Sequence, residues 1–189
     1  MPSAGEQGEE LLTWWSEHHP ATLADPRVTA LLPAWRRELT RLAPAFAGVA
    51  VHPLIHGDAV ATNVVLGPDG LPRLIDFEWS GPGDTAKDLA LIGGRVTGGP
   101  WYLPMTPDDV TAFVTEYSRY SRYSHHGRRS RHALDAGATD PQRLLERRDG
   151  YELLDRLGNL LYCLSRPGET RYRRWADELA HSLTARLGG

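Results

Sequence analysis

A stripe of apolar residues at helical spacing constrains the first quarter of the chain. Its members recur every three or four residues and are Val28, Leu31, Leu32, Trp35, Leu39 and Leu42. This period places the side chains on one face of an α-helix and is incompatible with the alternation of a strand. Asp25 before Pro26 is a typical helix start, and Pro44 ends the pattern. We therefore expect helices near 8–19 and 26–43, and no strand before residue 50.

Short runs of strand-forming residues follow. The segment 49–55 is apolar and partly β-branched, and two further runs, 63–66 and 73–75, flank the turn sequence Gly-Pro-Asp-Gly. This pattern predicts a β-hairpin. If Leu66 pairs with Arg73, Asn63 lies opposite Asp76 at the open end, where directly paired Cβ atoms are roughly 4.5–5.5 Å apart.

The remainder of the chain is predicted to be helical. Asp84 precedes a helical run over 85–92 that stops at a Gly-Gly pair, and further helices are expected from residue 106, near 141–165 and near 169–187. The polar segment 119–140 between them is expected to form a flexible loop. The chain as a whole is predicted to be a single α+β domain over 1–189, mostly α-helical, with a small β-hairpin.

Composition excludes several classes of protein. The 189 residues carry a net charge of −3, which provides no global field for nucleic acid, and the Arg- and Tyr-containing tract near residue 125 is too short to reverse that expectation. The single Cys163 cannot form an internal disulfide. No apolar run reaches the roughly 18 residues that span a bilayer, and residues 1–10 lack a signal-peptide core. We expect a cytoplasmic protein with no membrane or nucleic-acid partner.

Three motifs carry the candidate chemistry. They are HGDAVATN at 56–63, IDFE at 75–78 and GDTAKDLA at 83–90. Asp58 and Asn63 have the spacing of the catalytic loop in phosphoryl-transfer enzymes, where the aspartate accepts a hydroxyl proton and the asparagine binds metal. The oxygens of Asn63 and Asp76 suit Mg²⁺. The simpler interpretation of Asp58 and Asp76 is that they are surface acids, but both adjoin apolar runs where an unpaired charge is costly.

In this order the three motifs resemble those of the aminoglycoside phosphotransferase and choline kinase-like family, whose fold is that of the protein kinases. The resemblance implies a protein kinase-like C-terminal lobe that uses Mg²⁺ and ATP (or another nucleoside triphosphate) to phosphorylate a small hydroxyl-bearing substrate. The residues it implies are Asp58 as catalytic base, Asn63 and Asp76 as metal ligands, and His56, Asp84 and Asp88 as supports of the catalytic loop. Asp84 is better explained as a helix N-cap than as a reactant, and Asp88 is equally suited to be a solvated helix acid or a buried brace.

The nucleotide-covering part of such an enzyme is missing from the pattern. The family resemblance implies an N-terminal sheet lobe with a glycine-rich loop and a lysine, but the residues before His56 are predicted to be helical and contain no lysine. The single lysine, Lys87, follows Asp76 within a predicted helix. We therefore expect an isolated C-terminal lobe, truncated or dependent on a separate N-lobe or partner chain. The alternative is a catalytically inactive pseudokinase that binds a small ligand or a protein.

Overall fold

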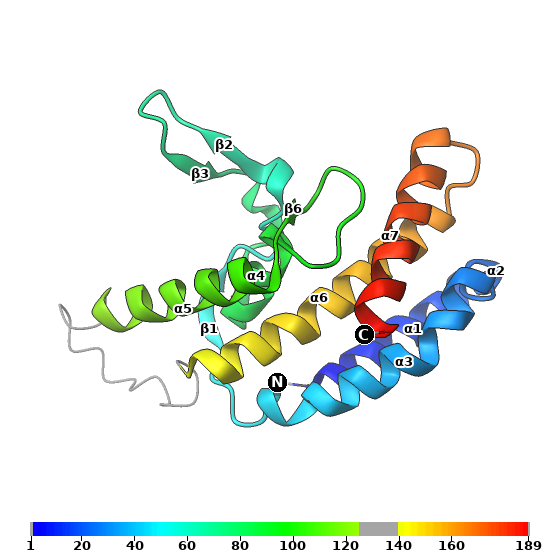
Figure 1. The fold of residues 1–189 in the computed structure, drawn as a ribbon, viewed down its shortest axis with the longest axis horizontal. Helices are drawn as coiled ribbons and strands as arrows, with labels where there is room; N and C mark the ends of the chain where they lie inside the picture. The colour runs from blue at the N-terminus through cyan, green and yellow to red at the C-terminus, as the bar shows by residue number, and fades with distance from the viewer. Residues whose placement is uncertain (1, 125–139, 189) are drawn as a thin grey trace.

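The computed structural model describes residues 2–124 and 140–188, and helices dominate it (Figure 1). The helices are α1 (Ala4–His18), α2 (Pro20–Leu23), α3 (Pro26–Leu42), α4 (Thr85–Ile92), α5 (Pro107–Ser124), α6 (Pro141–Leu164) and α7 (Thr170–Gly188). The strands are β1 (His52–Ile55), β2 (Val64–Leu66), β3 (Pro72–Leu74), β4 (Gly81–Gly83), β5 (Gly93–Gly94) and β6 (Leu103–Pro104). Within the described residues no strand precedes His52, so the expected mostly helical α+β class is confirmed.

The strands form three separate pairs. β2 and β3 make the expected antiparallel hairpin, which projects from the helical body in Figure 1. β1 pairs antiparallel with β4, and β5 pairs parallel with β6. The second and third pairs were not foreseen, because strands of two to four residues are too short to show a periodic pattern.

Local capping signals set the starts of the helices. Ser3 and Glu6 form a capping box at α1, with the Ser3 N–H donating to the Glu6 carboxylate at 2.7 Å. Asp25 caps α3 by accepting from the Arg27 N–H at 2.9 Å, and Pro26 occupies the first helical position. These contacts satisfy backbone donors that have no partner inside the helix. The expected helix starting at Pro26 is confirmed.

Helix α6 is the centre of the core. Figure 1 shows it running diagonally through the molecule, with α1 and α3 on one side and α4 on the other. The apolar face of α3 packs against it, and the buried Trp35 indole donates a hydrogen bond to the Leu153 carbonyl at 2.9 Å. The buried residues of the α3 stripe are Val28, Leu31, Trp35, Leu39 and Leu42. Burying large side chains of this kind contributes roughly 1.5–3 kcal/mol each.

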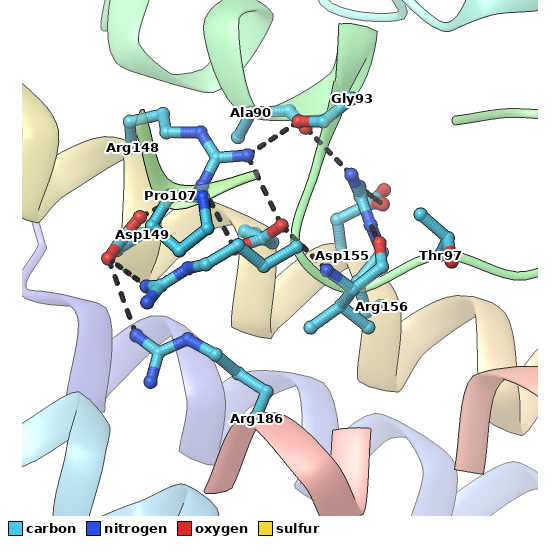
Figure 2. A network of polar contacts seen from close by, with 12 residues as sticks. Ala90, Gly93, Thr97, Pro107, Arg148, Asp149, Asp155, Arg156 and Arg186 are labelled. Carbon is cyan, nitrogen blue, oxygen red and sulfur yellow. Dashed lines mark hydrogen bonds and ion pairs between the residues drawn. The ribbon is translucent and has the colours of Figure 1, made fainter. Parts of the chain in front are cut away.

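Helix α6 also buries charged side chains, which the sequence pattern did not predict. Arg148, Glu152 and Arg156 are completely inaccessible to solvent. Arg148 donates to the Glu152 carboxylate at 2.9 Å and to the Gly93 carbonyl. Arg156 donates to the carbonyls of Ala90 at 2.9 Å and Val96 at 3.1 Å. Figure 2 shows Arg148 and Arg156 reaching from α6 toward the backbone at Ala90 and Gly93. The two guanidinium groups thus satisfy carbonyls where the chain leaves α4.

The charge of Glu152 is stabilised within this network. Burial alone disfavours the carboxylate, but the nearby Arg148 and Arg156 charges and the Val96 N–H, which donates to Glu152 at 3.1 Å, together lower the pKa of Glu152. A second buried pair joins α6 to the start of α4, where Arg147 donates to Asp84 at 2.8 Å. Buried charges of this kind are tolerated only when they are paired and hydrogen-bonded.

The hairpin has a different register from the expected one. Leu66 pairs with Pro72 and Val64 with Leu74, one residue earlier than predicted. Gly70 adopts φ +76°, a left-handed conformation that closes the turn early, and the Gly67 N–H then donates to the Leu71 carbonyl at 2.9 Å. The predicted pairing of Asn63 with Asp76 is therefore wrong. Asn63 lies opposite Ile75, whose N–H donates to the Asn63 carbonyl at 2.9 Å.

The structure differs from the expected loop at 119–140 at its start, whereas Asp140 at its end lies outside the helices, as the N-cap of α6. Residues 119–124 belong to the last turns of α5, where the helical pattern that begins at Pro107 continues. The rest of the expected loop, residues 125–139, lies outside the described residues. No helix in the described ranges is both long enough and apolar enough to cross a membrane.

Removing the charge of Glu152 tests the buried network. Glu152→Gln removes the completely buried carboxylate of this network and leaves Arg148 with only Asp149, and Arg156 with only Asp155, as acidic partners, so we expect a loss of about 3–5 kcal/mol in the free energy of unfolding, measured by urea titration. Glu9→Gln is the control, because Glu9 pairs with Arg36 at the exposed surface at 2.7 Å, where a pair contributes less than about 1 kcal/mol. Equal losses in the two variants would contradict a special role for the network.

The same network predicts a dependence on pH. Because folding lowers the pKa of Glu152, its contribution to stability is complete above the pKa of an unfolded glutamate and is lost as the pH falls through the lower folded value. We expect the urea midpoint of the wild-type protein to fall on acidification below about pH 4.5. The fall should be smaller in Glu152→Gln, and an identical pH profile in both proteins would exclude this contribution.

Candidate active site

The catalytic-loop sequence connects β1 to β2 by a backbone path that requires glycine. Gly57 follows the end of β1 and adopts φ +81°, the left-handed region that side chains disfavour. A Cβ atom at this position would lie 2.2 Å from the Trp79 carbonyl oxygen. The loop therefore passes closely over the segment that follows the IDFE motif, and any larger residue at position 57 would separate them.

The structure brings Asp58 and Asn63 together. The Asn63 amide donates to the Asp58 carboxylate at 2.9 Å and to the Asp58 carbonyl at 3.0 Å. The short 3-10 helix Ala61–Asn63 produces this return, since it folds the chain back within five residues. The Asn63 amide nitrogen donates to Asp58, so the side-chain oxygen is the atom of Asn63 that could coordinate a cation. Asp58 is half-buried and can be reached by a small molecule.

His56 links the loop to the end of the hairpin. Its buried ring places Nε2 at 2.9 Å from the Ile75 carbonyl and Nδ1 at 3.3 Å from the Asp58 N–H. A carbonyl only accepts, so Nε2 carries the hydrogen, and Nδ1 accepts from Asp58. The ring also contacts Phe77, with centroids 4.4 Å apart. With both nitrogens used by the backbone, His56 orients the loop and is not arranged for proton transfer.

Asp88 of α4 and Asp84, the residue that caps this helix, hold the loop on the helical core. Asp88 accepts from the N–H groups of His56 at 2.7 Å and Gly57 at 2.8 Å, so it is a brace and not a solvated helix acid. Asp84 caps α4 by accepting from the Ala86 N–H at 3.0 Å and also pairs with Arg147. The N-cap interpretation of Asp84 is confirmed. Asp84 therefore supports the loop indirectly, through the position of the helix that carries Asp88.

Asp76 stands apart from this bonded group. It directly follows the hairpin and is the one non-glycine residue with positive φ in the described chain, at +65°. Aspartate tolerates this conformation better than most residues, and residues held in it cluster at functional sites. Its side chain is exposed, and within the described ranges no hydrogen bond or ion pair joins it to Asp58 or Asn63. Strand pairing does not bring Asn63 and Asp76 opposite each other.

The donor set fits one kind of metal site. In the described residues no three His, Cys, Asp or Glu side chains converge on a point that could hold a metal ion. Asn63 and Asp76 instead offer two hard oxygens, one from an amide and one from an exposed carboxylate. Mg²⁺ usually takes one or two protein oxygens and fills its shell with water and phosphate oxygens. The residues therefore suit a metal bound together with a phosphate compound.

The segment before β6 also contacts the catalytic loop, which the sequence did not predict. The Ala61 N–H donates to the Trp101 carbonyl at 2.7 Å, and the hydroxyl of the adjacent Tyr102 donates to Asp155 of α6 at 2.6 Å. The catalytic loop is thus held from both ends, by Asp88 and by the segment before β6. The members of the first contact are 40 positions apart in the sequence and those of the second are 53 apart. No local sequence pattern predicts such contacts, so they become visible only in the folded chain.

The loop, its braces and the oxygen donors are those of a phosphotransferase-type protein. The model of the family described as "Phosphotransferase enzyme family" matches residues 3–126, well over half of the chain. The chain belongs to this family, and the match includes α1 and α3 as well as the three motifs. Comparison with curated proteins and with solved structures found no significant match.

Asp88→Asn tests the brace on the loop. The substitution replaces a carboxylate oxygen with an amide that faces a backbone N–H, so we expect the amide hydrogens of His56 and Gly57 to exchange at least about tenfold faster with solvent, a loss of about 1.4 kcal/mol in local protection. The measurement is hydrogen exchange followed by NMR. Asp69→Asn, in the hairpin turn, serves as the control. Unchanged exchange at both amides would show that Asp88 does not hold the loop.

Proposed function

We propose that the protein transfers the terminal phosphoryl group of ATP to a hydroxyl of a small substrate. The observation that carries this proposal is the Asp58–Asn63 pair, fixed by a hydrogen bond of 2.9 Å in a loop that Asp88 and His56 brace. Its five-residue spacing and its half-buried carboxylate match the work of a base beside a metal ligand. The family membership supports phosphotransfer as the type of reaction.

Each residue has a distinct role in this proposal. Asp58 accepts the proton of the substrate hydroxyl as its oxygen attacks the terminal phosphorus of ATP, while the bond from that phosphorus to the bridging oxygen breaks and ADP leaves. The hydrogen bond from Asn63 holds the carboxylate in place. Asn63 and Asp76 would bind Mg²⁺, which supplies positive charge to the phosphate oxygens. His56 keeps the Asp58 backbone in position. Catalysis of this kind depends on positioning and charge stabilisation more than on covalent chemistry by the protein.

The proposal includes a second structural unit that covers the nucleotide, because residues 2–124 and 140–188 show no such cover. Before β1 the described chain holds helices in place of strands, and no lysine or glycine-rich loop occurs there. Next to Asp76, Phe77 and Trp79 leave 53% and 70% of their surfaces exposed. Apolar surface of this extent beside a site favours coverage by another part of a protein. We propose a kinase-like C-terminal lobe that acts in the cytoplasm with a separate N-lobe or partner chain.

The absence of a lysine and a glycine-rich loop before β1 also favours a second candidate function. Without a lysine or glycine-rich loop for the phosphates, the site would serve as a pseudokinase that binds a small ligand or a protein and transfers nothing. The two functions differ in one measurable respect. Only the enzyme requires the carboxylate of Asp58 for turnover.

Asp58→Asn is the direct test of the proposed base. We expect ATP-dependent phosphate transfer to a panel of small alcohols to fall about 10²–10⁴-fold, because general-base catalysis contributes that much. The circular dichroism spectrum and the urea midpoint should stay unchanged. Wild-type turnover in the variant would eliminate Asp58 as the base, and absence of turnover in every wild-type preparation would favour the pseudokinase.

The need for a cover predicts weak nucleotide binding by the chain alone. We expect a dissociation constant for Mg·ATP in the millimolar range by calorimetry, because the phosphates would remain in water, where each ion contact is weakened. Addition of a candidate N-lobe should tighten binding, and Asp76→Ala should abolish the gain. Tight, Asp76-dependent binding by the chain alone would show that the cover is unnecessary.

A further inference from the structure

A cavity lies between α1, α4 and α6. Its volume is about 350 Å³. Gln7 and Leu11 of α1 line one wall, Tyr151, Asp155 and Asn159 of α6 line another, and Lys87 of α4 completes it. Cavities of this size hold small organic ligands, and a largely apolar lining with a few polar groups is typical of such sites.

Lys87 brings an uncompensated positive charge to this cavity. Among the described residues no ion pair or hydrogen bond involves its side-chain amine. It is also the single lysine of a chain that otherwise uses arginine for positive charge. An ammonium group without a partner in a partly enclosed cavity favours an anionic ligand.

The other charge in the cavity is already satisfied. One carboxylate oxygen of Asp155 accepts from the Tyr102 hydroxyl and from Arg156, each at 2.6 Å. The Arg156 guanidinium is completely buried, lies 3.3 Å above the Tyr102 ring and forms an ion pair with Asp155, so the Asp155 carboxylate already has a cationic partner inside the protein. Lys87 then determines the sign of the ligand. Asp155 still disfavours a dianion nearby, so a singly charged group fits best.

We propose that this cavity binds a small molecule with a single carboxylate on an apolar body. The Lys87 ammonium holds the carboxylate, and Leu11 with the ring of Tyr151 contacts the apolar part. The site goes beyond the proposed phosphotransfer and requires neither nucleotide nor Asp58. Lys87 directly precedes Asp88, which accepts hydrogen bonds from His56 and Gly57 of the catalytic loop. A ligand on Lys87 would therefore lie next to the residue that holds this loop.

The test uses three probes with the same ring and different charge. Phenylacetate is the anion, 2-phenylethanol the neutral analogue and 2-phenylethylamine the cation. In the full chain labelled with ¹³C-lysine, the single lysine gives one side-chain resonance to follow. We expect phenylacetate to shift it saturably and, by calorimetry, to bind at least about tenfold more tightly than 2-phenylethanol, as a charge-assisted contact requires.

Matched variants separate this contact from overall charge. Lys87→Met should lower the affinity for phenylacetate at least about tenfold, to that of the alcohol, and Lys87→Arg should retain most of it. Arg37→Met removes one positive charge from an exposed position outside the cavity and should bind as the wild type does. The proposal is overturned by tighter binding of the amine, by equal binding of all three probes or of none, or by equal losses in the Lys87→Met and Arg37→Met variants.

Discussion

The buried Arg148–Glu152 pair is the interaction on which the arrangement of the site depends. The chain leaves α4 at Gly93 and continues through the two-residue strand β5 to Val96, and the carbonyls of Gly93 and Val96 would otherwise be buried without these donors. Arg148 and Arg156 supply those donors from α6, and Glu152 forms the ion pair with Arg148 and accepts from the Val96 N–H. Because an unpaired buried carbonyl or guanidinium is costly, α4 is held in one position on α6. The acids that brace the catalytic loop are carried by that helix.

The parts of the structure that could be predicted are those that local chemistry determines. The apolar stripe of α3 and the N-caps Asp25 and Asp84 were visible because helical period and capping depend on residues a few positions apart. The contact between Asp58 and Asn63 is local in the same sense, since five residues separate them. The order of the motifs indicated the family, which the family model confirms.

The parts that could not be predicted depend on single conformations or on distant residues. One left-handed glycine, Gly70, closes the hairpin turn a residue early and moves Asn63 from Asp76 to Ile75. The burial of Arg148 and Arg156 could not be predicted from the sequence of α6, which is rich in charged residues. It is explained by the backbone carbonyls of Gly93 and Ala90, which belong to another segment of the chain. The binding of Mg²⁺ by Asn63 and Asp76 stays a prediction, because the ion would be held jointly by these two side chains and by a phosphate compound.

The ion pair between Asp84 and Arg147 has a consequence for the interpretation of natural variation. Arg147 is almost completely buried in α6 and belongs to none of the three sequence motifs, yet it holds the start of the helix whose Asp88 positions His56 and Gly57. We expect a survey of sequence variants scored by activity to rank Arg147 beside the loop residues, although Arg147 lies more than 80 residues along the chain from them. In this protein the boundary between functional and structural positions does not follow distance from the site.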